Sequence, residues 1–141
     1  MSRPSRPLWP WVVATAATAA AAVLLWKGKA PQPPTPFRVV YVTAPSSGVA
    51  DEMAAAIIET KLASCVNIIP AVTSHYMWEG KREKSNEALM VIKSSSTRLD
   101  ALEKLVNKLH PYDVPEFLVL PVHGGSSEYL GFLADGMSMS L

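Results

Sequence analysis

Residues 85–96, SNEALMVIKSSS, contain a strand-like run in which both alternating sets of side chains are apolar. Leu89 and Val91 would point to one side of a strand, and the other apolar residues of the run would point to the opposite side. A strand of this kind needs cover on both faces of its sheet, because exposed apolar surface is unfavourable in water. The run therefore predicts a strand that lies between two covering layers.

The chain just before this run predicts the other arm of a long hairpin. SCVNIIPAVTSHYMW at residues 64–78 is extended in character, and EGKREK at residues 79–84 is a polar turn that contains glycine. Pro70 lies inside the first arm. Because proline cannot donate a hydrogen bond to a neighbouring strand, it predicts a β-bulge or an edge position there.

Two further elements precede the hairpin. FRVVYVTA at residues 37–44 is rich in β-branched and aromatic residues, which predicts a first strand near the middle of the sheet. Ser47 is then a candidate N-cap, and apolar residues at helical spacing predict a helix within residues 45–63. The side chains expected on its core face are Met53, Ile57, Ile58 and Leu62.

A second helix is expected directly after the hairpin. STRLDALEKLVNKLH at residues 96–110 places Ser96 or Thr97 at the N-cap, and Pro111 ends the helical pattern. The residues expected on its core face are Leu99, Leu102, Leu105, Val106 and Leu109.

The last part of the domain predicts one more strand and one more helix. PEFLVLPV at residues 115–122 is apolar enough for a fourth, buried strand, and a short C-terminal helix is expected to begin near Ser126 or Ser127. The resulting order is typical of an α+β ferredoxin-like fold. In that fold, split β-α-β units form one antiparallel sheet with both helices on one face. Here an extended hairpin and an extra C-terminal helix are added, and the bare face of the sheet predicts self-association.

Charge divides unevenly along the 141 residues. Residues 1–50 contain five Lys and Arg and no acid, a net +5, whereas residues 51–141 contain eight Lys and Arg against twelve Asp and Glu, a net −4. A mildly acidic domain without a basic cluster does not attract a phosphate backbone, which excludes nucleic-acid binding. Cys65 is the only cysteine, so no intramolecular disulfide forms, and its apolar neighbours predict a small buried side chain rather than a nucleophile.

The first 29 residues have a composition of their own. Residues 8–26, LWPWVVATAATAAAAVLLW, carry no charge and are framed by arginines and lysines, so they predict a signal anchor and membrane association. The alternatives are a cleaved secretory signal, a transit peptide for the mitochondrion or plastid, and a disordered leader. APQPPTP at residues 30–36 is a proline-rich linker, and the folded domain is expected at residues 37–141.

Several stretches of the folded domain resemble the CutA family, which is named for divalent-cation tolerance. They are VTAP at residues 42–45, LASCVNIIPAVTSHYMWEGK at residues 62–81 and LHPYDVPEFLVLPV at residues 109–122. The resemblance covers essentially all of residues 37–135 and implies the ferredoxin-like fold. It also implies a homotrimer whose sheets pack inward, which would supply the second covering layer.

The resemblance implies binding of a divalent metal, copper in particular, by bacterial members of the family. Their ligands are a cysteine at the end of the first strand and two successive histidines before the PY pair. In this chain the three positions are occupied by Val42, Leu109 and His110. Only the last of these offers a ligand atom, so His110 is the metal-site candidate and copper binding is expected to be weak.

The remaining candidate site residues lie in the corner that begins at His110 and on the hairpin. His110 is also a candidate C-terminal cap of its helix. Tyr112 and Glu116 belong to the proline-stiffened corner, which is expected to form the wall of a cleft or a subunit boundary. The hairpin residues expected at an interface are His75, Tyr76 and Trp78.

From these features we predict a non-enzymatic protein, and we assign no catalytic residue. TAPSSGV at residues 43–49 contains no Arg or Lys to bind a phosphate, and a glycine-rich phosphate loop is absent from the sequence. The leading hypothesis is a trimeric CutA-like protein that acts in copper or other divalent-metal tolerance, or that scaffolds and localises a partner protein. The alternative is a PII-like trimeric sensor that binds a small molecule in the clefts between subunits.

Overall fold

The computed structural model describes residues 34–140, and the predicted leader at residues 1–29 lies outside this range. The elements are β1 (Phe37–Ala44), α2 (Ser47–Glu59), β2 (Cys65–Trp78), β3 (Lys81–Ser95), α3 (Leu99–Leu109), β4 (Leu118–Pro121) and α4 (Ser127–Gly136). Their order confirms the expected succession of strands and helices, including the long hairpin and the extra C-terminal helix.

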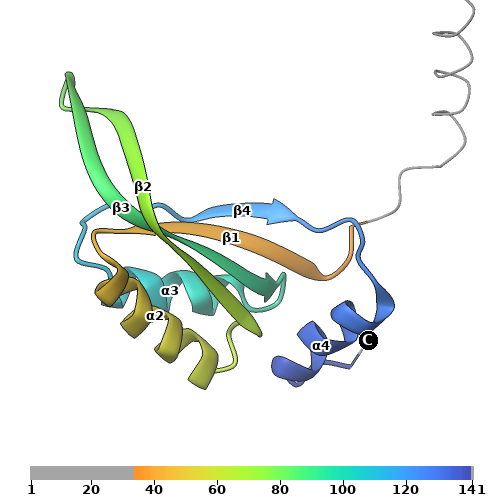
Figure 1. Ribbon diagram of the computed structural model, residues 1–141. Coiled ribbons are helices and arrows are strands. Elements are labelled where there is room, and N and C mark those ends of the chain that lie inside the picture. Colours follow the sequence, from red (N-terminus) through yellow and green to blue (C-terminus); the bar gives the residue numbers. More distant parts are fainter. Residues whose placement is uncertain (1–33, 141) are drawn as a thin grey trace, which may run out of the picture. The chain divides into compact units, whose positions relative to one another are not determined.

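The four strands form one sheet in the order β2-β3-β1-β4, and each neighbouring pair is antiparallel. Helices α2 and α3 lie on the same face of this sheet, and the β2–β3 hairpin extends well beyond the end of β1 (Figure 1). This is the α+β ferredoxin-like arrangement that the sequence predicts. Strands β1 and β3 take the two central positions, as expected from their apolar composition.

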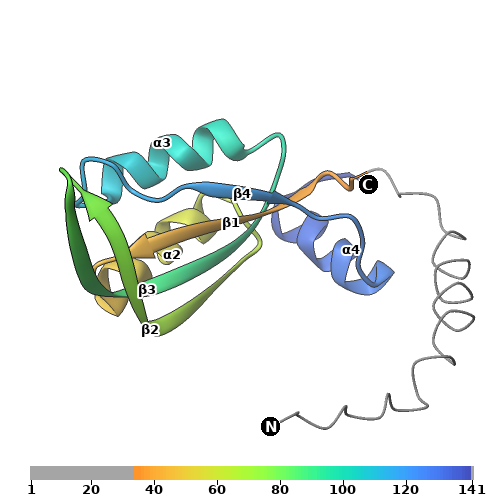
Figure 2. The same ribbon diagram turned by 90° about the horizontal axis from the view of Figure 1, so that it is seen from above.

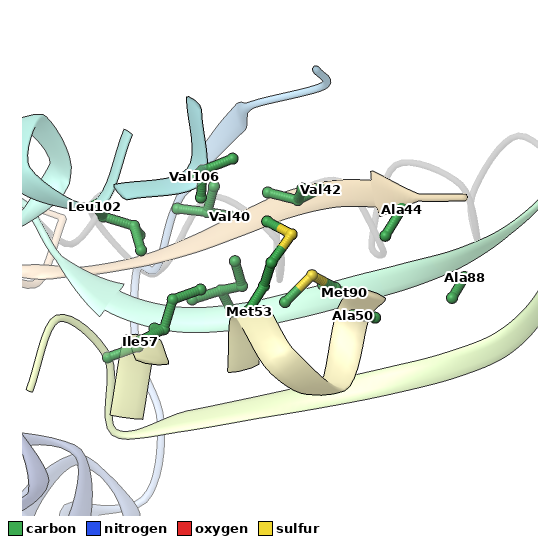
Figure 3. Packing of buried hydrophobic residues seen from close by; sticks show 12 residues of the cluster. Val40, Val42, Ala44, Ala50, Met53, Ile57, Ala88, Met90, Leu102 and Val106 are labelled. Atoms are coloured by element: carbon green, nitrogen blue, oxygen red, sulfur yellow. The ribbon is translucent and has the colours of Figure 1, made fainter. Parts of the chain in front are cut away.

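The core lies between the sheet and the two helices. Val40, Val42, Met90 and Ile92 point from the sheet toward α2 and α3, and all four are fully buried. They meet a layer of helix side chains, as the close view in Figure 3 shows. That layer is formed by Ala50, Met53, Ile57, Leu102 and Val106. Complete burial of each large apolar side chain contributes about 1.5–3 kcal/mol of transfer free energy, so this layer stabilises the domain.

The opposite face of the sheet has no covering layer in the described residues, and we call it the open face. Seen from above in Figure 2, its strands are not overlaid by any of the three helices. Leu89 and Val91 of β3 and Tyr41 of β1 point to this side and are only partly buried. Ile69, which pairs with Leu89, is 46% exposed. The second covering layer that residues 88–92 require is therefore not supplied by residues 34–140.

At three places, side chains that the sequence predicts to be buried are exposed, and each difference has a geometric reason. Ile58 is 41% exposed because it lies about 100° around the helix from Ile57, whose side chain takes the core position. Leu109 is exposed because it is the last residue of α3, and His110 occupies the buried place after it. The strand expected at residues 115–122 is short and lies at the sheet edge, which leaves Leu118 and Val119 exposed.

The helix starts also differ in part from expectation. Ser46, not Ser47, caps α2, because its Oγ accepts a hydrogen bond of 3.3 Å from the backbone N–H of Val49. Neither Ser96 nor Thr97 caps α3. The Thr97 hydroxyl instead pairs with that of Ser95 at 3.1 Å, so it is not free to cap the helix.

The predicted start of α4 is confirmed, whereas the predicted burial of Cys65 at the start of β2 is only partly correct. Helix α4 begins at Ser127, and Ser126 Oγ accepts a hydrogen bond of 3.3 Å from the backbone N–H of Tyr129, as expected. Cys65, expected to be fully buried, is only partly buried because it is the first residue of β2. Lys93 Nζ lies 3.7 Å from its Sγ.

The described residues contain no helix that is long and apolar enough to cross a lipid bilayer. Residues 8–26, for which a membrane anchor is predicted, lie outside residues 34–140.

Helix α4 closes the end of the domain through a second, smaller core. Leu133, Ala134 and Met137 pack against Phe37 of β1. The contact between α4 and the start of β2 is close, because a Cβ added at Gly136 would lie 2.8 Å from Cβ of Ser64. The Ser64 hydroxyl also donates a hydrogen bond to the Leu133 carbonyl. Glycine at position 136 is therefore required by space.

We expect Gly136→Ala to lower the free energy of unfolding by about 1–3 kcal/mol, because the helix end must move away from Ser64. Gly131→Ala is the matched control in the same helix, since a Cβ at position 131 meets no atom within 4 Å. That substitution should raise stability by about 0.5–1 kcal/mol, the usual gain from replacing a helical glycine. Urea unfolding of both variants at one protein concentration measures the two shifts, and equal shifts would contradict the packing of α4.

Candidate functional site

A β-bulge in β2 decides which hairpin side chains face the open side of the sheet. The pairing with β3 is regular up to Ile69 and resumes at Val72, which confirms the irregularity predicted from Pro70. Val72 pairs with Glu87 and therefore shares its side of the hairpin. Because the bulge inserts one extra residue, the even-numbered residues from 72 to 78 now face the same side as Leu89.

These residues form one wall of a hollow of about 850 Å³ on the open face. Tyr41, Thr43 and Leu89 of the central strands form its floor. The opposite wall is the α3–β4 corner, residues 111–116, which lies beside the base of the hairpin in both ribbon views (Figures 1 and 2). The hairpin wall consists of Val72, Ser74, Tyr76 and Trp78.

His110 fixes the corner to the sheet. It follows the last residue of α3 and is only 7% exposed. Its Nε2 lies 2.7 Å from the Thr43 carbonyl, which can only accept, so Nε2 carries the proton and donates. Its Nδ1 accepts a hydrogen bond of 3.1 Å from the backbone N–H of Tyr112. The imidazole thus joins β1 to the corner instead of bonding to carbonyls of its own helix.

Tyr112 and Glu87 link the corner to the floor of the hollow. The Tyr112 hydroxyl donates a hydrogen bond of 3.2 Å to Glu87 Oε1, and its ring meets the ring of His110 edge-on at a centroid distance of 4.8 Å. Burial raises the pKa of Tyr112 above its ordinary value of 10.0, and the negative charge and hydrogen bond of Glu87 raise it further. Tyr112 is therefore held as a neutral phenol next to a carboxylate.

The structure brings together four of the predicted site residues. Tyr76, Trp78, Tyr112 and Glu116 all line the hollow. His75 does not, because it alternates with Tyr76 and points to the other side of the hairpin. Contact of any of these residues with a second subunit stays a prediction.

Two aromatic or ionisable lining residues, Tyr41 and Glu87, were missed at the level of sequence. Tyr41 carried no signal that separates it from ordinary strand residues. Glu87 did carry one, because it alternates with Leu89 and Val91 and therefore belongs to the same face of the strand. A carboxylate in line with that apolar stripe could have marked the open face as a binding surface.

The copper site of the family does not fit the residues at its three positions. Val42 is in the core and Leu109 has no ligand atom. Both ring nitrogens of His110 already take part in hydrogen bonds, so a metal ion would have to displace one of them. Within residues 34–140 no group of three or more His, Cys, Asp or Glu side chains is arranged to hold a metal ion. Weak binding of copper at His110 stays a prediction.

Comparison with known proteins gives one consistent family. A family model described as CutA1 divalent ion tolerance protein matches residues 38–136. Protein CutA, chloroplastic, of Arabidopsis thaliana is 46% identical over 98 residues, which are 70% of this chain and 54% of that protein. The divalent-cation tolerance protein CutA of Pectobacterium atrosepticum is 46% identical over 95 residues, 67% of this chain and 86% of that protein.

Solved structures show the same fold. The crystal structure of CutA1 from Oryza sativa superposes with a TM-score of 0.70 at 45% identity, over 73% of this chain and 94% of that one. The match spans only about half the length of the plant and mammalian relatives, between 54% and 55% of each.

The Tyr112–Glu87 contact gives a pH-dependent prediction. Because folding raises the pKa of Tyr112 above 10.0, its contribution to stability is fully present below about pH 10 and is lost as pH rises through the higher folded value. Tyr112→Phe should therefore lose about 0.5–1 kcal/mol of unfolding free energy at neutral pH, as expected for a partly exposed hydrogen bond. The loss relative to wild type should shrink in strong alkali.

Phenolate absorbance measured during an alkaline titration tests the same contact. The difference between wild type and Tyr112→Phe isolates one tyrosine, which should ionise later than a free phenol. Glu87→Gln should make this ionisation earlier, whereas Glu59→Gln, at the exposed end of α2 on the other face of the sheet, should leave it unchanged. A Tyr112 that ionises like a free phenol would refute the contact.

Proposed function

Since this chain belongs to the CutA1 divalent ion tolerance family, we propose that it serves divalent-cation tolerance as a non-enzymatic homotrimer whose subunits cover one another's open faces. The observation that carries the proposal is the half-covered sheet. Strand β3 is apolar on both sides, and the helices within residues 34–140 cover only one of them. Burial of the exposed apolar area between subunits would favour assembly, and part of this gain is offset by the lost freedom of the separate subunits.

Two unpaired strand edges support assembly as well. Among residues 34–140, strand β4 pairs only with β1, and β2 pairs only with β3. Exposed edges tend to add further strands, and a long hairpin that projects beyond its own sheet is well placed to reach a neighbouring copy. The trimeric state itself rests on the resemblance to the family.

The lining of the hollow supports a non-enzymatic role. Serine and threonine hydroxyls are present at Ser74 and Thr43, but none of the lining residues is a histidine, lysine or cysteine that would activate a nucleophile. Because His110 is engaged in two hydrogen bonds, we favour a rigid scaffold for a partner protein over storage of copper at that residue.

Sensing of a small molecule is a second candidate function, and the hollow supports it. Its volume of about 850 Å³ is within the range of small-molecule sites, which is about 300–1,000 Å³. In a trimer, the hollow would become a cleft bordered by a second copy, as in PII-like sensors.

For the compartment, we propose that residues 1–29 direct the chain either to a membrane or to an organelle. The relatives named chloroplastic, from Arabidopsis thaliana and Oryza sativa, support the organelle alternative. Cell fractionation followed by sequencing of the mature N-terminus separates the two. A transit peptide predicts a soluble organelle form that starts after the apolar stretch, whereas an anchor predicts an uncleaved chain in the membrane fraction. A soluble uncleaved chain would contradict both.

Two isoleucines of similar exposure provide a matched test of assembly. Ile69 on the open face is 46% exposed, and Ile58 on the outer side of α2 is 41% exposed. Ile69→Glu should dissociate the trimer, because it places a charge in an apolar interface, whereas Ile58→Glu should leave the mass unchanged. Sedimentation velocity of the purified full-length chain measures both. A wild-type monomer at micromolar concentration, or an unchanged mass for Ile69→Glu, would overturn the proposal.

A further inference from the structure

The charged side chains that line the hollow are all acidic. Among its lining residues are the three acids Glu87, Asp113 and Glu116, and no lysine, arginine or histidine. Four aromatic residues complete it, namely Tyr41, Tyr76, Trp78 and Tyr112. A cavity that combines carboxylates with aromatic rings attracts cations and repels anions.

Glu87 is the most unusual member of this set. Its side chain is only 7% exposed, and the hydrogen bond from the Tyr112 hydroxyl is its single side-chain partner among the described residues. No lysine or arginine within residues 34–140 forms an ion pair with it. A carboxylate removed from water loses several kcal/mol of solvation unless a counter-charge or further hydrogen bonds replace the lost water. Glu87 is therefore a largely desolvated acceptor beside the hollow, and a cation there would replace part of its lost hydration.

A second polar group near the hollow is also without a partner. Ser85 Oγ is buried and makes no hydrogen bond within the described residues. Ser85 pairs with Ser74, which lines the hollow, so both hydroxyls belong to the side of the hairpin that carries Glu87. Ser85 itself does not line the hollow, so a ligand there would meet the Ser74 hydroxyl and the Glu87 carboxylate. A protonated primary amine has three donors for such oxygens.

The aromatic residues favour an organic cation over a bare metal ion. Trp78 is 52% exposed although it lines the hollow, so its ring offers a face on which an apolar group or a cation can rest. A cation over such a ring is attracted electrostatically by its π face. A divalent metal would instead need several oxygen ligands around one point, and no such group exists among residues 34–140.

We propose that the hollow between the hairpin and the α3–β4 corner binds a protonated primary amine with an apolar body. The ammonium group pairs with the Glu87 carboxylate, and the apolar body stacks on Trp78 and Tyr76. The inference deepens the sensing function proposed above and rests on it. It also sets the sign of the ligand charge, since a nucleotide or another phosphate would meet three carboxylates and no lysine, arginine or histidine among the described lining residues.

Three ligands that share one phenyl body but differ in charge test the inference. Isothermal calorimetry of the full-length chain at neutral pH compares 2-phenylethylammonium, the neutral 2-phenylethanol and the anion phenylacetate. The cation should bind at least about tenfold tighter than the alcohol, which corresponds to about 1.4 kcal/mol, and the anion should not bind. Equal binding of cation and alcohol, or no binding of the cation, overturns the inference.

Two pairs of variants locate the site. Glu87→Gln should remove the preference for the cation, whereas Glu59→Gln, at the exposed end of α2 on the covered face of the sheet, should not. Trp78→Leu should lower the affinity for the cation several-fold. Met77→Leu, on the other side of the hairpin and 66% exposed, should leave this affinity unchanged. Because Trp78 and Met77 are exposed, these two variants fold even if a change at the buried Glu87 does not.

Sedimentation of the same samples separates failure of this inference from failure of the proposed assembly. If the chain is trimeric but the amine does not bind, and Glu87→Gln lowers the mass, the counter-charge of Glu87 is a cation of a second copy. The inference then fails while the trimer stands. If the chain is monomeric and still prefers the amine, the trimer fails while the cation site stands.

Discussion

Strand β3 has apolar side chains on both of its faces, while the helices within residues 34–140 cover only one. On the covered face, Met90 and Ile92 are completely buried against α2 and α3. On the open face, Leu89 and Val91 are only partly buried. The same strand thus holds the subunit together and leaves apolar area that is unfavourable in water. The proposed trimer, the position of the hollow and the burial of Glu87 all follow from this asymmetry.

Two local structural features, a β-bulge and a histidine, shape the hollow on the open face. The bulge next to Pro70 turns the even-numbered residues of the hairpin toward the open face. Without it, strict alternation from Ile69 would place His75 and Met77 there in place of Tyr76 and Trp78. His110 is the second feature, because its hydrogen bonds with the Thr43 carbonyl and the Tyr112 backbone N–H hold the corner against β1. One extra residue and one imidazole therefore set the chemistry of the lining.

The fold was largely predictable from the sequence, because each element has its own periodicity and the order of elements leaves few topologies. The errors arise where the sequence allows several structural assignments equally well and packing selects one of them. Ser96 and Thr97 are good caps by type, but Thr97 pairs with Ser95 instead. The site was harder to predict. Pro70 indicated a bulge, yet the residue at which pairing resumes depends on the partner strand, so His75 and Tyr76 could not be separated. The role of His110 depends on Thr43, which lies 67 residues away in sequence.

The buried carboxylate of Glu87 links the two proposals physically. In a single copy the hollow is open to water, which screens the attraction between Glu87 and a bound ammonium group. A second copy over the open face would exclude part of that water and strengthen the attraction, so the assembled form would bind the cation more tightly. By thermodynamic reciprocity, a bound cation would then stabilise the assembly by the same free energy. Self-association and ligand charge are in this way two consequences of one surface, where an apolar stripe and a buried acid lie on the same face of β3.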